Sequence, residues 1–274
     1  MPIRVSALAL LVIWALPGAD FMLRLRTCVE PFKGSGVWQE AQFERRLDAP
    51  RTAVVVCDMW DHHWCGGAER REALLVPRMT ALLTLARSRG MLIVHAPSDT
   101  MQFYKEYPQR RWVLSLAPVA PPPNLTLDAP PLPIDDSDGG CDSGQRPAKP
   151  YPWSRQHAGI PIAEGDAITD KGAEVYTLLR ARDIRDLIVM GVHANMCILN
   201  RTFAIKQMTR WGVPAILVRD MTDAMYNPQQ RPFVSHERGT EMVIEHIEKF
   251  WCPTTLSADL TAALKPLPAA RTGK

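Results

Sequence analysis

The stretch Leu187-Ile-Val-Met-Gly-Val-His-Ala-Asn-Met-Cys197 runs from four apolar residues through a glycine to a cysteine. The apolar run and the turn residue predict a buried parallel strand, and residues 198–211 predict a helix behind it. The cysteine therefore falls at a helix N-terminus. Unpaired N–H groups and the helix dipole favour a thiolate there, and the same groups can hold an oxyanion. A buried cysteine that only packs is the structural alternative.

The same alternation of strands and helices continues on both sides of this stretch. Residues 52–57 and 91–95 predict buried strands, and residues 69–89 between them predict a helix that stops at Gly90. Further apolar and amphipathic runs predict strands at 166–169 and 215–218 and helices at 172–182 and 236–250. This order predicts an α/β fold, a three-layer α/β/α sandwich with a mainly parallel, doubly wound sheet.

The composition is that of an ordinary globular protein. The chain has 274 residues, of which 46% are hydrophobic and 22% charged, enough for a full core. A net charge of +3 leaves no basic footprint for nucleic acid, so a small-molecule substrate is the expected partner. A homo-oligomer remains open.

The first nineteen residues have the pattern of a secretory signal peptide. A short basic start precedes an apolar run and small residues, which predicts export to the periplasm or the extracellular medium. The apolar run is short for a bilayer, so no stable membrane insertion is expected after signal removal. The alternative is an apolar arm that packs on the body of the protein.

The six cysteines fall into two groups. Cys57 and Cys197 lie in core-like contexts, whereas the other four lie in loop-like contexts in which an exported protein forms bridges. Pairing Cys65 with Cys141 and Cys28 with Cys252 is one of three ways to join those four, and the sequence does not choose among them.

The chain divides around a proline-rich insertion. Residues 20–50 predict an N-terminal extension, and residues 51–274 predict one domain with the insertion at about 97–165. A loop of this length is usually a lid or a disordered segment, and its aromatic residues argue against disorder. Its acidic tract, residues 135–142, lacks the full calcium-loop pattern, so a solvated acidic turn is favoured.

Three reactive residues follow predicted strands. Asp58 comes after the first strand, Lys171 after the third and Cys197 after the fourth. Ligands gather at the carboxyl ends of strands in open parallel sheets. A carboxylate can take the proton of a thiol, and an ammonium group favours both the thiolate and an anionic intermediate. This layout indicates cysteine-dependent acyl transfer.

Residues 54–58, 166–171 and 191–197 resemble the isochorismatase-like cysteine hydrolases, which include nicotinamidases, N-carbamoyl amidohydrolases and isochorismatases. The resemblance covers residues 52–96 and 160–250. It implies hydrolysis of a C–N bond in a small amide through a thioester, without a required cofactor. It also implies a catalytic triad of Asp58 as base, Lys171 as supporting cation and Cys197 as nucleophile. A cis peptide between Val192 and His193 would place the N–H groups of His193 and Cys197 in an oxyanion hole.

The sequence departs from this family after Lys171. A helix signal begins at once, whereas the family has a longer segment with an aromatic residue. A lysine in an exposed turn is the alternative, and Arg155 or Arg219 would then supply the positive charge.

A second departure follows Asp58. Trp60 and Trp64 suit stacking on a flat substrate, and Asn195 is assigned with them to substrate binding. His62 and His63 are suited to metal binding or turn outward. The segment 95–99 lacks the Asp-x-His spacing of a nicotinamidase metal site, so no metal ligands are assigned and metal binding stays open.

Other functions remain open at this stage. One is a catalytically silent binding protein of the same fold, and another is a vinyl-ether hydrolase of the isochorismatase type. A nucleotide-binding protein is disfavoured because no Gly-x-Gly-x-x-Gly turn follows the first strand. An activated Cys197 would react with alkylating agents well below the ordinary thiol pKa of about 8.5.

Overall fold

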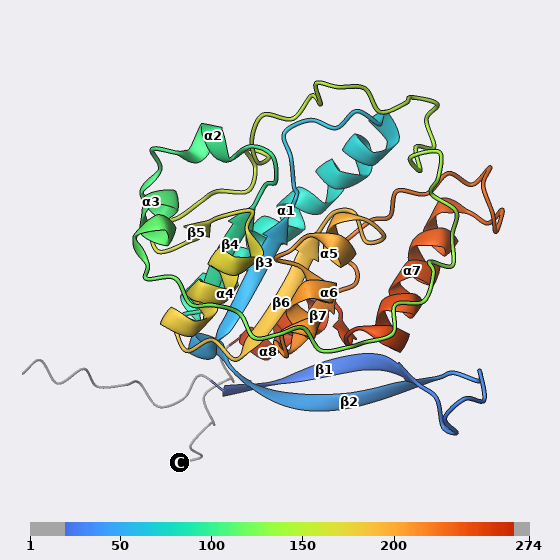
Figure 1. Cartoon of the computed structure of the whole chain (residues 1–274), viewed down its shortest axis with the longest axis horizontal. Coiled ribbons are helices and arrows are strands. Elements are labelled where there is room, and N and C mark those ends of the chain that lie inside the picture. The colour runs from blue at the N-terminus through green and yellow to red at the C-terminus, as the bar shows by residue number, and fades with distance from the viewer. Residues whose placement is uncertain (1–19, 266–274) are drawn as a thin grey trace, which may run out of the picture.

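The computed structural model describes residues 20–265, so the predicted signal peptide lies outside the described residues. Eight strands in this part of the chain form one sheet in the order β2-β1-β8-β7-β6-β3-β4-β5 (Figure 1). The strands are β1 Asp20–Val29, β2 Gln39–Asp48, β3 Thr52–Cys57, β4 Leu92–Ala96, β5 Ala167–Ile168, β6 Asp186–Gly191, β7 Ala215–Val218 and β8 Thr254–Thr255.

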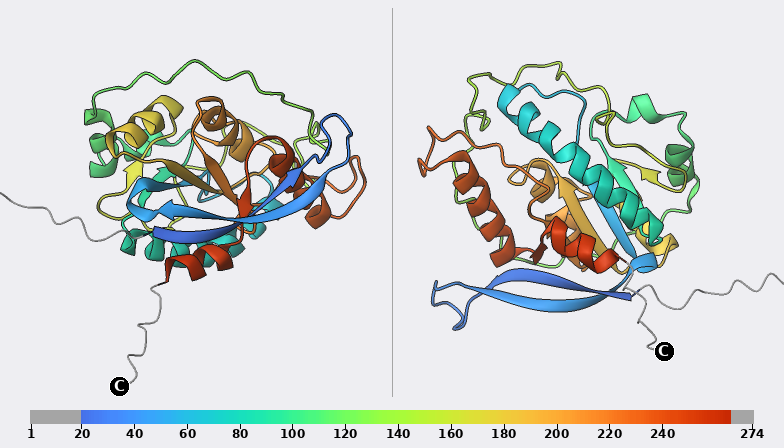
Figure 2. Two further views of the ribbon diagram at one scale, coloured as in Figure 1. Left: turned by 90° about the horizontal axis from the view of Figure 1, so that it is seen from below. Right: turned by 180° about the vertical axis from the view of Figure 1, so that it is seen from behind.

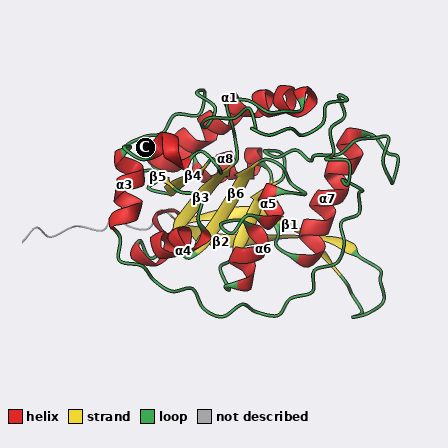
Figure 3. Ribbon diagram, turned by 45° about the horizontal axis from the view of Figure 1, so that its top comes forward, coloured by secondary structure: helices red, strands yellow, loops and turns green. Residues whose placement is uncertain are grey.

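Helices cover both faces of the sheet (Figures 2 and 3). The helices are α1 Gly66–Ser88, α2 Met101–Tyr104, α3 Pro108–Ser115, α4 Gly172–Ala181, α5 Cys197–Asn200, α6 Ile205–Arg210, α7 His236–Phe250 and α8 Ser257–Leu264, with a 3₁₀ turn at Ala49–Arg51. Apolar side chains of α1 and α8 form one core against the sheet, and those of α4 to α7 form the other. The predicted three-layer α/β/α sandwich is confirmed.

The centre of the sheet is parallel. β3 pairs in parallel with β4 and β6, and every residue of β3 and β6 is buried. Burial on both faces explains why these strands are continuous apolar runs. Their shared carboxyl edge places the residues that follow Cys57, Ala96 and Gly191 next to one another.

The helix predicted over 198–211 is two separate helices. α5 ends after a single turn, the backbone of Arg201 is extended, and α6 begins at Ile205. The side chain of Arg201 turns instead toward Asp58, to which it donates a hydrogen bond. A tertiary contact has therefore interrupted a locally helical pattern.

The predicted N-terminal extension is a β-hairpin that joins the sheet. β1 and β2 pair antiparallel over their full lengths, and β1 also pairs with β8. Phe21, Leu23 and Leu25 alternate along β1 and are buried, the period expected of a strand with one covered face.

The insertion is ordered by specific contacts. It contains α2 and α3, and its later part is tied to the body by a disulfide between Cys65 and Cys141. Cys28 and Cys252 are free, so only the first of the two bridges considered from the sequence is present. Among residues 20–265, no helix combines the length and apolar character needed to cross a membrane.

Candidate active site

Asp58 is the buried centre of the site. It follows β3 in a left-handed backbone conformation with φ +47°, and its side chain is inaccessible to solvent. Its Oδ1 accepts the backbone N–H of Ser98 at 2.7 Å, and its Oδ2 accepts Nε of Arg201 at 2.9 Å. The thiol of Cys197 is close enough to this carboxylate that each of the two groups shifts the pKa of the other. One carboxylate therefore contacts both a thiol and a guanidinium group.

Cys197 is the first residue of α5 and is partly exposed. Its backbone N–H has no acceptor within the helix, as is general for a first helical residue. The N–H of His193 is directed at the Cys197 sulfur, and the Val192–His193 peptide is cis. Two backbone N–H groups, of His193 and Cys197, therefore lie beside the thiol, and the cis peptide is the one that the family resemblance implies.

Gly191 permits the close approach of these segments. Its φ is +119°, and a Cβ there would lie 2.0 Å from the carbonyl oxygen of Cys57. The next residue, Val192, donates its N–H to that same oxygen at 3.0 Å. Glycine at this position brings the chain that leads to Cys197 against the end of β3, where Asp58 begins.

Arg201 is the cation of the site. It lies four residues after Cys197, and its guanidinium group bridges two carboxylates. Nε donates to Asp58, and Nη2 donates to Asp99 Oδ2 at 3.2 Å. The sequence analysis missed this residue. Its spacing of four from the cysteine suggests one helical turn, but α5 ends before Arg201, so this spacing alone does not identify it.

The structure does not bring Lys171 to this centre. The Lys171 side chain is 64% exposed, and its ammonium group lies 3.3 Å from Asp170. The physical reason is that α4 begins at Gly172, which makes Lys171 the N-cap residue and leaves its side chain outside. The two arginines considered as alternative cations also contact other groups. Arg155 packs over the ring of Phe103, and Arg219 donates a hydrogen bond to Thr254.

Burial sets the protonation of the thiol. It raises the pKa of Cys197 well above that of an ordinary thiol, and the negative charge of Asp58 raises it further. Arg201 and the N–H of His193 act in the opposite direction but do not prevail. This upward direction is opposite to the one expected for a cysteine at a helix N-terminus, and α5 is a single turn, too short to supply the full dipole of a long helix.

The pKa values of Asp58 and Arg201 are shifted as well. Burial raises the pKa of Asp58, although Arg201, Cys197 and Ser98 all oppose the rise. Burial alone would lower the pKa of Arg201, but the charges of Asp58 and Cys197 raise it overall. The site thus combines a thiol, a carboxyl group and a permanent cation, and burial disfavours the charged forms of the first two.

A group of aromatic rings lies beside the oxyanion donors. Trp60 stacks on Trp153 of the insertion with ring centroids 4.2 Å apart, and its Nε1 donates to the carbonyl of Ser98 at 3.0 Å. The ring of His63 meets that of His193 edge to face at 5.0 Å. Trp64 packs against the Cys65–Cys141 disulfide. One face of Trp60 is therefore covered by the insertion.

Asn195 has a structural position. Its side chain is buried, and Nδ2 donates to the carbonyl of Met225 and to Asp136. Its Oδ1 accepts the N–H of Met225 at 2.9 Å. Because these contacts occupy both ends of the amide, Asn195 ties the loop before Cys197 to the insertion instead of facing a substrate.

The candidate metal ligands are engaged otherwise. Burial lowers the pKa of His63 to about 4 and that of His193 to about 3, so both rings are neutral. His62 is exposed and lies 3.5 Å from Glu69. A group of potential ligands lies at Cys65, Cys141 and Asp142, but its two sulfurs form the disulfide.

The acidic tract is bonded to protein groups. Asp136 accepts from Asn195, Asp138 from Asn227 and Asp142 from Arg71. The bond from Asn195 to Asp136 holds the insertion beside the Cys197 loop. The tract is thus a docked segment of the site's surroundings.

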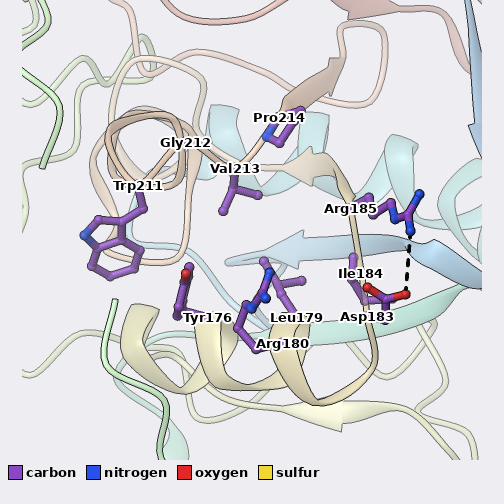
Figure 4. A pocket seen from close by; sticks show the side chains of 10 residues that line it. All are labelled: Tyr176, Leu179, Arg180, Asp183, Ile184, Arg185, Trp211, Gly212, Val213 and Pro214. Carbon is purple, nitrogen blue, oxygen red and sulfur yellow. Dashed lines mark ion pairs between the residues drawn. The ribbon is translucent and has the colours of Figure 1, made fainter. Parts of the chain in front are cut away.

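A separate pocket of about 310 Å³ lies at the other end of the strands (Figure 4). Its lining includes Tyr176 and Arg180 of α4, the residues just before β6, and Trp211 to Pro214 before β7. β6 and β7 begin there, whereas Cys197 follows the carboxyl end of β6. This pocket is therefore not part of the site.

No protein-family model matches the sequence, and no curated protein matches it. A cysteine hydrolase from Pseudomonas syringae pv. phaseolicola 1448A has a similar structure, with a TM-score of 0.52 and 20% identity over 80% of this chain and 94% of that one. An isochorismatase from Pseudomonas putida KT2440 gives a TM-score of 0.48 and 13% identity over 77% of this chain and 90% of that one. The chain therefore has the α/β fold of the Pseudomonas syringae cysteine hydrolase, the fold that its sequence motifs predict.

Proposed function

We propose that the chain is a hydrolase that cleaves the C–N bond of a small amide through a thioester on Cys197. One observation carries this proposal: the carboxylate of Asp58 contacts both the thiol of Cys197 and the guanidinium group of Arg201. A nucleophile, its base and a charge-stabilising cation are thereby in direct contact.

The first half of the reaction forms the thioester. Asp58 takes the thiol proton as the Cys197 sulfur attacks the amide carbonyl carbon, and the carbonyl π electrons move to oxygen. The backbone N–H groups of His193 and Cys197 stabilise this oxyanion. When the C–N bond breaks, protonated Asp58 gives its proton to the leaving amine, and the acyl group remains on sulfur.

The second half releases the acid. Asp58, again a carboxylate, takes a proton from water as the water oxygen attacks the thioester carbonyl. The C–S bond then breaks, the sulfur regains a proton and a carboxylic acid leaves. Because no step changes an oxidation state, the cycle needs no redox cofactor.

Arg201 is suited to the place that the family resemblance gave to Lys171. Arginine remains charged at any physiological pH, and its planar group can hold two carboxylates at once. Its charge offsets the negative charge that passes between Asp58, the sulfur and the carbonyl oxygen. Arg201 therefore favours the ionised form of Asp58, against the burial that raises its pKa.

Acyl transfer fits this arrangement better than the alternatives. A vinyl-ether hydrolysis has no need of a nucleophilic thiol hydrogen-bonded to a base. A silent binding protein has no need of two free backbone donors beside a partly exposed sulfur. The contact between Cys197 and Asp58 is the observation that favours catalysis.

The test is turnover of a panel of small primary amides and N-carbamoyl compounds, measured as ammonia release. Wild type should turn over at least one of them, and Cys197→Ala should lose about 10³-fold or more. Intact-protein mass spectrometry should detect an acyl adduct on wild type alone. Cys28→Ser, a change at a cysteine remote from the site, serves as the matched control.

Three results would contradict the proposal. Undiminished turnover in Cys197→Ala would remove the nucleophile. Binding of amides without turnover or adduct would indicate a silent binding protein. Vinyl-ether hydrolysis that survives Cys197→Ala would indicate the isochorismatase-type reaction.

We also propose that the protein works outside the cytosol. The Cys65–Cys141 disulfide supports an oxidising compartment, where such bonds persist. Fractionation of cells that express the full chain, with thiol labelling of each fraction, tests this. Recovery of the protein only in the cytosol with Cys65 reduced would contradict it.

A further inference from the structure

The two edges of the sheet differ greatly in length. β5 ends one edge with two residues, whereas β2 ends the other with ten. β2 contains neither proline nor glycine and pairs with β1 without a break. Among the described residues, no element lies beyond the outer edge of β2 in Figure 1 or in the right view of Figure 2. Its outward N–H and C=O groups are therefore free to accept another strand.

We propose that β2 pairs antiparallel with β2 of a second copy of the chain, about a two-fold axis through Phe43. The eight strands of each copy then form one continuous sheet. The interface is isologous, because the same strand serves both copies.

The register follows from geometry and charge. A two-fold axis perpendicular to the sheet keeps each side chain on its own face, so residues that meet are separated by an even number of positions. With the axis through Phe43, Glu40 of each copy lies opposite Arg46 of the other. Opposite charges in such pairs are favourable, and this pair occurs twice.

Neighbouring registers place like charges together. An axis through Gln42 sets Glu40 opposite Glu44 twice, which is unfavourable. An axis through Glu44 sets Glu44 opposite itself and Glu40 opposite Asp48. An axis through Arg45 sets Arg45 opposite itself and shortens the overlap. The register centred on Phe43 avoids every direct opposition of like charges.

The contacts within one copy extend this pattern. Glu40 lies 3.4 Å from Arg26 of β1, and Arg46 lies 2.8 Å from Asp20 of β1. Positive and negative side chains then alternate across the junction. Their order is Arg26 and Glu40 of one copy, followed by Arg46 and Asp20 of the second copy. Glu40 and Arg46 are 49% and 73% exposed, so both can reach the other copy.

Phe43 adds an apolar contact at the axis. It pairs with Leu25 of β1 and shares the face on which Leu25 is buried, yet it is itself 41% exposed. Two such rings facing each other across the axis would cover one another, and an aromatic cross-strand pair stabilises a sheet. An exposed aromatic residue flanked by complementary charges indicates a second copy as the partner.

The experiment measures the mass of the full chain in solution by light scattering and sedimentation over a range of concentrations. Wild type should be a dimer in equilibrium with monomer. Glu40→Arg and Arg46→Glu should each raise the dissociation constant at least tenfold, because each places like charges opposite twice. Lys105→Glu, at an exposed position just after α2 and far from β2, is the matched control and should leave the dimer intact.

Mixing the two variants tests the register itself. Each new charge then faces an opposite charge on the other variant, so an equal mixture of Glu40→Arg and Arg46→Glu should form a heterodimer with an affinity near that of wild type. Phe43→Cys should form an intermolecular disulfide on mild oxidation, since residues opposite one another in antiparallel strands lie about 5 Å apart. Lys105→Cys, remote from β2, should form no such disulfide.

Three outcomes would overturn the proposal. Wild type could remain monomeric at every concentration. Both charge variants could remain dimers with unchanged affinity, which would place the interface elsewhere. The mixture could fail to associate although each variant has the far-ultraviolet circular dichroism of wild type, which would exclude this register.

Discussion

The end of β5 and the end of α5 each present a basic residue near the carboxyl edge of the sheet, but the two differ in what surrounds them. Lys171 is 64% exposed and meets only Asp170 among the ion pairs of residues 20–265. Arg201 bridges Asp58, which is fully buried, and Asp99. The backbone position of a charge is thus not enough to give it a catalytic role.

Side-chain direction explains the difference. Gly172, the first residue of α4, lies against Thr202. A Cβ added at Gly172 would lie 2.0 Å from the carbonyl oxygen of Thr202. This contact fixes the start of the helix and leaves Lys171 as an exposed N-cap. α5 stops after one turn, and the extended backbone at Arg201 lets its side chain reach Asp58. Where a helix starts or stops therefore decides which cation enters the site.

Removing the carboxylate that both the thiol and Arg201 contact should have the largest effect. Asp58→Asn should lower kcat/KM for amide hydrolysis about 10³-fold or more, because the thiol loses its proton acceptor. Ammonia release measures this, and circular dichroism checks folding. A loss of less than tenfold would contradict the role of Asp58 as base.

Changing the bridging cation should have the next largest effect. Arg201→Ala should lower kcat/KM about 100-fold, because the buried charge of Asp58 loses its partner during the reaction. Arg201→Lys should recover part of this loss, since it keeps the charge but not the planar pair of hydrogen bonds. Equal rates for Arg201→Ala and wild type would show that the bridge has no catalytic role.

The buried pair of His236 and Asp223 can be compared with the pair of Arg201 and Asp58, because histidine, unlike arginine, titrates near neutral pH. His236 Nε2 lies 2.8 Å from Asp223 Oδ1, and although burial lowers the pKa of His236, the hydrogen bond to Asp223 raises it overall. A raised pKa gives stability that is complete below the unfolded value of about 6.5 and is lost as pH rises through the folded value.

His236→Gln should therefore cost about 1 kcal/mol of unfolding free energy near pH 6 and less near pH 9. Urea denaturation across this range measures the difference. Arg201→Ala should show no such trend between these pH values, because arginine does not titrate there. The same cost of His236→Gln at both pH values would contradict the raised pKa.

Removing the exposed cation should have the smallest effect. Lys171→Ala should change kcat/KM less than about twofold, as is usual for an exposed surface charge outside the reacting groups. The same ammonia assay measures it. A loss above tenfold would return Lys171 to the site.

Much of the fold could be predicted from local patterns. The strand at 52–57, the strand at 215–218 and the helix at 236–250 have the predicted bounds, because a buried parallel strand is a continuous apolar run and an amphipathic helix has a clear period. Asp58 and Cys197 follow from this pattern, since Asp58 comes directly after β3 and Cys197 begins the helix that follows β6.

Arg201 could not be placed in the same way. Within residues 198–211 it has the appearance of a basic residue on a solvent-facing helix, and only its contact with Asp58, 143 positions away, interrupts that helix. The assignment of Asn195 to substrate binding has a similar explanation, because the insertion whose Asp136 accepts a hydrogen bond from its amide is distant in the sequence. Side chains whose partners lie far along the chain are beyond local patterns.

The most direct measurement is the pH midpoint for alkylation of Cys197 by iodoacetamide, followed at that residue by peptide mass spectrometry. In wild type it should lie well above about 8.5, since burial and Asp58 raise the pKa of the thiol. Asp58→Asn should lower the midpoint, Arg201→Ala should raise it and Lys171→Ala should leave it unchanged. An unchanged midpoint in Arg201→Ala together with a raised one in Lys171→Ala would contradict the account.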